Sequence, residues 1–269
     1  MAELAPQVRR VTAPNAGMMT GPGTNTYIVG VNEVAVIDPG PRIEAHLEKI
    51  LNDAPGPIRW ILTTHTHPDH SPAAAPLAQR TGAELIGMPA PDGTHQDKTY
   101  SPHRIPSDGD VLETPEFRLQ MIHTPGHASN HVCYLQEQPN WLYTGDHIMN
   151  GSTVVIDPPD GNMADYIRSL EKLKQFPIDA IAPGHGDLLH EPFAAVDWLI
   201  AHRFEREEKV IEALAEHPES TSVELVPFAY REVDEKLYGW AERSLLAHLG
   251  KLEEEGRARF RDGRWQLVS

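Results

Sequence analysis

Short apolar runs alternate with helical repeats over the first two thirds of the chain. Residues 26–30, 33–40 and 58–65 are apolar enough to predict strands, and residues 43–52 carry apolar side chains at helical spacing. The alternation continues with helices at 71–82 and 163–176 and with strands at 83–87, 117–126, 131–136, 141–146 and 179–186. This order predicts a layered α/β domain built on sheets.

The pattern changes after Glu191 to longer helical repeats. Helices are expected at 194–217, 222–230 and 235–256, and a hairpin at 258–268 turns at Asp262-Gly263. Three helices followed by a hairpin are typical of a winged-helix module. We therefore expect a catalytic domain over residues 1–190 and a helical, winged-helix-like domain over residues 191–269.

Composition narrows the class of protein. The chain has 269 residues, of which 40% are hydrophobic, and its apolar runs are shorter than the roughly 20 residues of a membrane-spanning helix. The first residues lack the pattern of a signal peptide, so we expect a cytoplasmic protein with no membrane partner. The single cysteine, Cys133, reads as a buried strand residue, and any metal must be held by nitrogen and oxygen ligands.

The charge disfavours nucleic-acid partners. With 23 basic and 39 acidic residues, the formal net charge is −16, which opposes attraction to phosphate backbones. The third C-terminal helix carries Glu242 and the run Glu253–Glu255, while Leu245, Leu246 and Leu249 read as a core face. We expect no DNA binding and regard RNA as a disfavoured partner. A lid over the site or a homodimer contact is the preferred role of this domain.

The stretch ILTTHTHPDHS, residues 61–71, concentrates candidate metal ligands. His65 and His67 lie two apart where a strand is expected to end, so an extended backbone points both rings to one side. Pro68 then ends the strand, and Asp69 and His70 follow in a turn, where they suit a second ion. A polar turn that is merely rich in histidine is the alternative, and we would prefer it for an isolated histidine. Four candidates in six residues favour a metal site.

Three further candidates occupy similar positions at the ends of predicted strands: His127, Asp146 and His185. Ligands in layered α/β proteins bind at the carboxyl ends of strands, so we expect the four clusters to meet there. Seven ligands suffice for two divalent ions if one carboxylate bridges them, with a hydroxide between the metals as the nucleophile. Zn²⁺ is the expected metal, with manganese and iron as alternatives.

The same residues resemble a known family. Thr64–His70 reads T-H-x-H-x-D-H, the motif of the metallo-β-lactamase superfamily, and His127, Asp146 and His185 follow in the order of its other motifs. The segments TGPGTNTYIVG, HTPGHASNH and IAPGHG, together with the tail, are most similar to the glyoxalase II and lactamase-beta-2-like branch. The resemblance implies an αββα sandwich with the metals at one edge between the two sheets.

The resemblance also implies roles. His65, His67 and His127 would hold the first zinc, Asp69, His70 and His185 the second, and Asp146 would bridge them. The absence of a cysteine at position 146 argues against the B1 and B2 types of true β-lactamase. Asp69 and Asp146 are the expected catalytic residues, and Asp69 would also orient the attacking water.

The expected activity is hydrolysis of a small ester, thioester or lactone, and the alternative that the resemblance offers is a single-stranded RNA endonuclease. Asn25 is a candidate substrate contact on the rim formed by GPGTNT, with an ordinary turn as an equal alternative. We expect His131 to pack near the metals or support their ligands and His147 to be structural.

Overall fold

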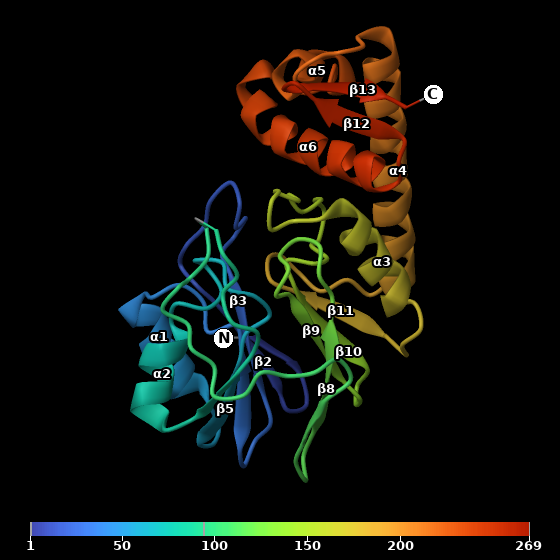
Figure 1. Cartoon of the computed structure of the whole chain (residues 1–269). Coiled ribbons are helices and arrows are strands. Elements are labelled where there is room, and N and C mark those ends of the chain that lie inside the picture. The colour runs from blue at the N-terminus through green and yellow to red at the C-terminus, as the bar shows by residue number, and fades with distance from the viewer. Residues whose placement is uncertain (1, 94, 269) are drawn as a thin grey trace. The chain divides into compact units, whose positions relative to one another are not determined.

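The structure is a computed structural model that describes residues 2–93 and 95–268. The chain divides into two compact units (Figure 1). The first contains the chain up to Thr124, then Asn130–Val154 and Phe176–Pro192. The second contains Pro125–Ser129, Val155–Gln175 and the chain from Phe193 onward. The domain limit between residues 190 and 191 stays a prediction.

Two sheets form the first unit. The six-stranded sheet has the order β1-β2-β3-β4-β5-β6, and the five-stranded sheet has the order β11-β10-β9-β8-β7. The strands of the first sheet are β1 (Ala2–Ala5), β2 (Val8–Thr12), β3 (Asn25–Val29), β4 (Val34–Ile37), β5 (Ile58–Leu62) and β6 (Glu84–Ile86). Those of the second are β7 (Val111–Glu113), β8 (Arg118–His123), β9 (Val132–Gln136), β10 (Trp141–Gly145) and β11 (Ala180–Pro183).

The core of this unit lies between the two sheets. Tyr27, Ile37 and Leu62 of the first sheet pack in one buried cluster with Tyr134 and Tyr143 of the second. Helices α1 (Glu44–Asp53) and α2 (Ala74–Thr81) lie on the outer side of the six-stranded sheet (Figure 1). Their apolar side chains form a second cluster with that sheet. The fully buried strands explain the continuous apolar runs of the sequence.

Three strands are absent from the pattern-based prediction. Strands β1 and β2 precede the first predicted strand, and β7 has only three residues. Strand β1 is half exposed along its length and β2 has two arginines at its centre, so neither has an apolar run. Strand β5 also ends at Leu62 rather than near His65, which corrects the predicted end of that strand.

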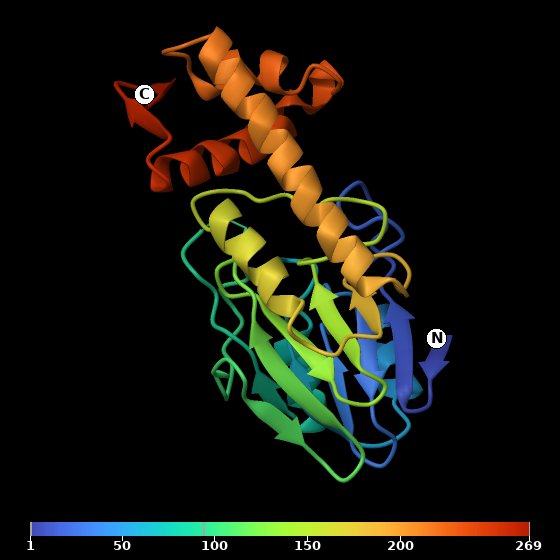
Figure 2. The ribbon, with the colours of Figure 1, turned by 90° about the vertical axis from the view of Figure 1, so that its right-hand side faces the viewer.

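The second unit contains the remaining helices and a hairpin. Its helices are α3 (Met163–Leu173), α4 (Pro192–Glu216), α5 (Ser222–Ala229), η1 (Glu235–Leu237) and α6 (Tyr238–Glu254). The first residue of α4, Pro192, is counted with the first unit. Strands β12 (Ala258–Arg261) and β13 (Arg264–Leu267) pair antiparallel around the predicted turn. Figure 2 shows α4 as one continuous helix.

One hydrophobic core joins the C-terminal elements of the second unit. Leu245 and Leu249 are fully buried there, which confirms the core face predicted for α6, and Trp265 of the hairpin packs in the same cluster. The capping box of Thr221 and Glu224 fixes the start of α5. Within the described residues, no helix has the length and apolar character required to cross a membrane.

Candidate metal centre

Parallel strand pairs bring four loops to one edge of the first unit. Strands β4 and β5 are parallel neighbours in one sheet, and β10 and β11 are parallel neighbours in the other. Each is followed at its carboxyl end by one of the sequence clusters or by Asp38. The Asn25 amide donates to the Gly184 carbonyl at 2.7 Å, which joins the ends of the two sheets. The loops meet because both sheets point their carboxyl ends toward the same edge.

Four of the predicted ligands form one tight group in this unit. Asp69, His70, Asp146 and His185 each direct one ligand atom to a common point, and these atoms all lie within 4.8 Å of one another. Asp146 Oδ1 lies 3.2 Å from the Nε2 atoms of both histidines. Asp69 Oδ2 lies 3.2 Å from His185 Nε2 and 3.4 Å from His70 Nε2. Segments separated by more than one hundred residues therefore share one site.

The outer nitrogen of each imidazole is held by an acceptor. His70 Nδ1 lies 2.9 Å from Asp38 Oδ2, and His185 Nδ1 lies 3.2 Å from the carbonyl oxygen of Gly23. A neutral ring that donates from Nδ1 presents a lone pair at Nε2. Both lone pairs would then face carboxylate oxygens, which is favourable only when a cation lies between them. The donor set therefore fits a divalent metal that accepts nitrogen and oxygen ligands.

Electrostatics of the protein alone show the same need for positive charge. Burial acts to raise the pKa values of Asp69 and Asp146, but neighbouring imidazolium charge holds both values below the usual range. Burial likewise acts to lower the pKa of His185, yet Asp146 raises it to about 10. The pKa of His70 is also raised, against burial, by Asp69 and Asp146. A buried site that retains protons against desolvation is one in which a metal ion can replace them.

The other three predicted ligands, His65, His67 and His127, are divided between the two units. In the first unit, His65 Nε2 lies 3.0 Å from His67 Nδ1, although β5 ends before either residue. His127 belongs to Pro125–Ser129, the short segment that groups with the second unit, and its Nδ1 lies 2.7 Å from the Val155 carbonyl oxygen. The ring contact of His65 and His67 is close enough for one cation to bind both.

Asp38 is a functional candidate that sequence reasoning missed. Its carboxylate accepts hydrogen bonds from the Thr64 amide at 2.7 Å and the Thr64 hydroxyl at 2.8 Å, besides its contact with His70. The residue is 2% exposed and adopts a left-handed backbone with φ of 50°. A buried carboxylate behind a ligand histidine fixes the orientation of its ring. The available signal was a charged residue placed directly after the apolar strand β4.

Asn25 does not lie on a substrate rim, which corrects that prediction. Asn25 is only 1% exposed, and its side-chain amide donates to the carbonyl oxygens of Pro183 and Gly186. Asn25 therefore joins β3 to the loop after β11. Its neighbour Thr24 contacts the site instead, because the Thr24 hydroxyl donates to Asp69 Oδ2 at 3.2 Å.

Two other histidines support the ligand cluster from behind. The His131 ring stacks on that of His65 at a centroid distance of 5.1 Å, and its Nδ1 contacts the Thr124 hydroxyl at 3.0 Å. His147 packs against His131, and both are fully buried. These positions agree with the packing roles expected for them. Cys133 is also a buried strand residue, as predicted.

Two glycines permit the close approach of loops at the site. A Cβ on Gly145 would lie 2.3 Å from the Thr64 hydroxyl, and one on Gly184 would lie 2.8 Å from Asp146 Oδ1. Gly145 also has a φ of 45°, a conformation that other residues adopt at a cost. Larger side chains at either position would displace Asp146 or Thr64.

Comparison with known proteins agrees with this geometry. The family profile described as "Metallo-beta-lactamase superfamily" matches residues 19–185, and the "Beta-lactamase associated winged helix domain" matches residues 221–265. The chain is 30% identical to a "Beta-lactamase-like protein 2 homolog" from Drosophila melanogaster, over 96% of this chain and 92% of that protein. It is 31% identical to "Thioesterase pkgB" from Emericella nidulans, over 80% of this chain and 61% of that protein.

A solved structure shows the same fold. The crystal structure of a beta-lactamase domain protein from Burkholderia ambifaria matches with a TM-score of 0.84 at 22% sequence identity, covering 99% of this chain and 93% of that one. The expected fold class, including the C-terminal winged helix, is therefore confirmed. By its matched profile, its relatives and its clustered His/Asp groups, the chain belongs to the metallo-beta-lactamase superfamily.

Proposed function

We propose that this protein is a dinuclear, zinc-dependent hydrolase that cleaves a small ester, thioester or lactone. The observation that carries the proposal is the convergence of the partly buried Asp69 with the buried His70, Asp146 and His185 at the edge of the two sheets. Superfamily membership makes hydrolysis the expected class of reaction. The 31% identity to a protein named as a thioesterase favours thioesters among the candidate substrates.

Each group of residues has a proposed role in holding metal. His65, His67 and His127 would hold one ion, Asp69, His70 and His185 the other, and Asp146 would bridge the two. When bound, divalent ions at such a site polarise the scissile group and make water nucleophilic near neutral pH. Imidazole and carboxylate ligands without a thiolate suit zinc and also admit manganese or iron.

The residues of the chain orient this chemistry. Thr24 donates to Asp69 Oδ2, which fixes the carboxylate that we expect to align the attacking water. Asp38 accepts from Thr64 and contacts His70 Nδ1, so the ring cannot rotate away from the site. Side chains held by a second layer of hydrogen bonds are already in their reactive geometry, which lowers the cost of reaching the transition state.

The test combines metal analysis with a substrate panel. Elemental analysis of protein purified without added metal is expected to find two divalent ions per chain, with zinc predominant. Thioester, ester and lactone substrates are then assayed beside single-stranded RNA, each with and without a chelator. Chelator-sensitive thioester, ester or lactone turnover with intact RNA supports the proposal. Chelator-sensitive RNA cleavage, lost in Asp146→Asn, would support the endonuclease alternative instead.

A further inference from the structure

The hairpin β12–β13 concentrates positive charge in a chain whose net charge is −16. Residues 257–266 include four arginines and one aspartate, a formal net charge of +3. The pairing register sets Arg259 opposite Gln266 and Arg261 opposite Arg264. Directly opposed residues of two paired strands share a face of the hairpin. One face therefore presents three guanidinium groups and one amide.

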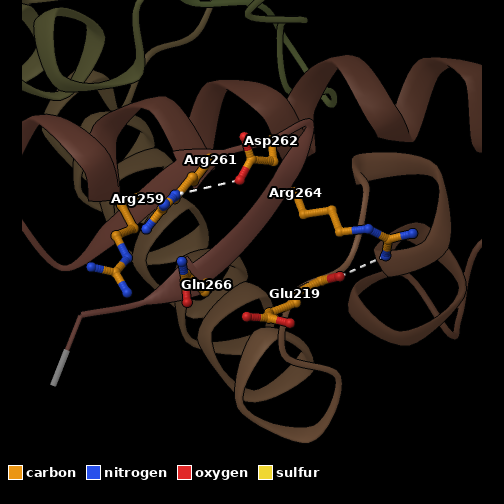
Figure 3. A pocket seen from close by; sticks show the side chains of 6 residues that line it. All are labelled: Glu219, Arg259, Arg261, Asp262, Arg264 and Gln266. Atoms are coloured by element: carbon orange, nitrogen blue, oxygen red, sulfur yellow. Dashed lines mark hydrogen bonds and ion pairs between the residues drawn. The ribbon is translucent and has the colours of Figure 1, made fainter.

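This face borders a pocket within the second unit. Figure 3 shows the six side chains that line it: Glu219, Arg259, Arg261, Asp262, Arg264 and Gln266. Its volume is about 220 Å³, below the range of about 300–1,000 Å³ that is usual for drug-sized ligands. The size and polarity of the pocket suit a small anionic group.

Backbone contacts fix the walls of the pocket. The Trp265 amide donates to the Ser220 carbonyl at 2.8 Å, and the Arg264 guanidinium donates to the Glu219 carbonyl at 2.6 Å. The Trp265 side chain packs in the core of the unit and against the Phe260 ring. The hairpin and the turn at Glu219 are therefore held together by the fold of the protein itself.

The guanidinium groups of the hairpin are engaged only in weak interactions and can still bind an anion. Arg261 lies 3.4 Å from Asp262 with both side chains more than 70% exposed, and Arg264 lies 3.2 Å from the exposed Glu224. Exposed pairs of this kind are weak and exchange readily with other anions. Among the residues that the structure describes, no ion pair is found for Arg259. Arg261 and Arg264 also face each other across the strands, an arrangement of like charges that an anion would relieve.

We propose that this hairpin face binds a phosphate group, held by Arg259, Arg261 and Gln266, with Arg264 adding positive charge. The planar guanidinium fork matches phosphate oxygens in pairs, and the Gln266 amide adds a neutral donor. The Glu219 carboxylate also lines the pocket and opposes an anion, so it should limit the affinity. The phosphate can come from a small phosphorylated molecule or from a polynucleotide backbone. This binding role lies beyond the proposed hydrolysis and does not depend on it.

The test uses the full chain titrated with inorganic pyrophosphate by calorimetry at low ionic strength. The double variant R259Q/R261Q is expected to bind about ten-fold more weakly. The variant E219Q is expected to bind about three-fold more tightly, because it removes an opposing charge. The matched control is R231Q, because Arg231 is an exposed arginine of the same unit that pairs with Glu216, and neither residue lines the pocket. It should change the affinity by less than about two-fold.

Weaker binding in R259Q/R261Q together with tighter binding in E219Q indicates a site at the hairpin. Unchanged affinity in R259Q/R261Q, or an equal loss in R231Q, would overturn the proposal and point to the metal centre or to nonspecific attraction. If the double variant fails to fold, the affinity of the single variant R259Q tests the proposal, because this substitution removes no ion pair of the described structure. A parallel titration with short oligothymidylate identifies the source of the phosphate, because the probe that resembles it should bind more tightly. If neither probe binds, the proposal is overturned.

Discussion

The metal centre and the hairpin both gather charged side chains, but burial makes them respond differently. At the metal centre, His70 has no exposed side-chain area and the Asp146 side chain is 12% exposed. On the hairpin, Arg261 and Asp262 are 73% and 87% exposed. Water and salt screen the second set, whereas the first set interacts through a poorly polarisable interior. A charge removed from the metal centre should therefore cost far more than one removed from the hairpin.

The largest effect is expected at Asp146. The change Asp146→Asn keeps the size of the side chain but removes the charge between His70 and His185. We expect hydrolytic turnover to fall by about 10³-fold and the metal content to drop, because the proposed bridging ligand is lost. Steady-state kinetics and elemental analysis of the purified variant measure both. Asp187→Asn is the matched control, because Asp187 lies two residues beyond His185 with its side chain 84% exposed. Equal losses in the two variants would contradict the assignment.

The next effect tests whether burial of charge matters away from the metal centre. Glu207 of the second unit is 3% exposed and accepts from Lys251 at 2.7 Å and from Arg257 at 2.9 Å. The change Glu207→Gln removes the buried carboxylate that pairs with Lys251 and leaves it only the partly exposed Glu255. We expect the free energy of unfolding to fall by about 3 kcal/mol, the low end of the cost of breaking a buried pair. Chemical denaturation measures it. The control Glu216→Gln breaks the exposed pair with Arg231 and should cost less than about 0.5 kcal/mol. Similar costs for both variants would remove the contrast between buried and exposed pairs.

A third variant tests Asp38 as a positioning residue. The change Asp38→Asn keeps an acceptor for Thr64 but weakens the hold on His70 Nδ1. We expect metal affinity to fall by about 10–100-fold, which is usual for partners of ligand histidines. Competition with a chromogenic chelator gives the affinity, and added metal should restore turnover. Loss of turnover at saturating metal with unchanged affinity would instead assign Asp38 a different role.

The smallest effect concerns pH and a buried histidine outside the metal centre. Burial lowers the pKa of His46 to about 4, and its Nε2 lies 2.8 Å from the Thr26 hydroxyl. The unfolded chain takes up this proton near pH 6.5 while the folded protein does not, so stability falls as the pH drops below 6.5. Between pH 7 and pH 5 this group should cost about 2 kcal/mol.

The variant His46→Leu isolates that contribution. Urea denaturation at the two pH values should show a decrease in stability that is smaller in the variant by about 2 kcal/mol. Acid loss of metal affects both proteins alike, so the difference between them isolates His46. An identical decrease in the two proteins would show that His46 is protonated in the folded state.

Part of the fold was visible in local patterns. The continuous apolar runs at β3, β4, β9 and β10 gave their strands, because strands buried on both faces have little polar interruption. Strand β2 was missed because Arg9 and Arg10 lie at its centre, and only its pairing with β3 makes it a strand. The predicted end of β5 was also wrong, since hydrogen bonding rather than side-chain polarity sets where a strand stops.

The chemical identity of the metal centre was set by the sequence itself. Histidine and aspartate residues at the ends of strands indicate metal binding whatever the tertiary structure, because their donor atoms and their spacing can be read from the sequence. The tertiary structure decided which of these atoms meet, and it also placed Asp38 behind His70, an unpredicted contact. Asn25 shows the reverse case, since it looked available to substrate but bonds to Pro183, 158 residues away. Such contacts depend on how two sheets pack, and no local pattern records that packing.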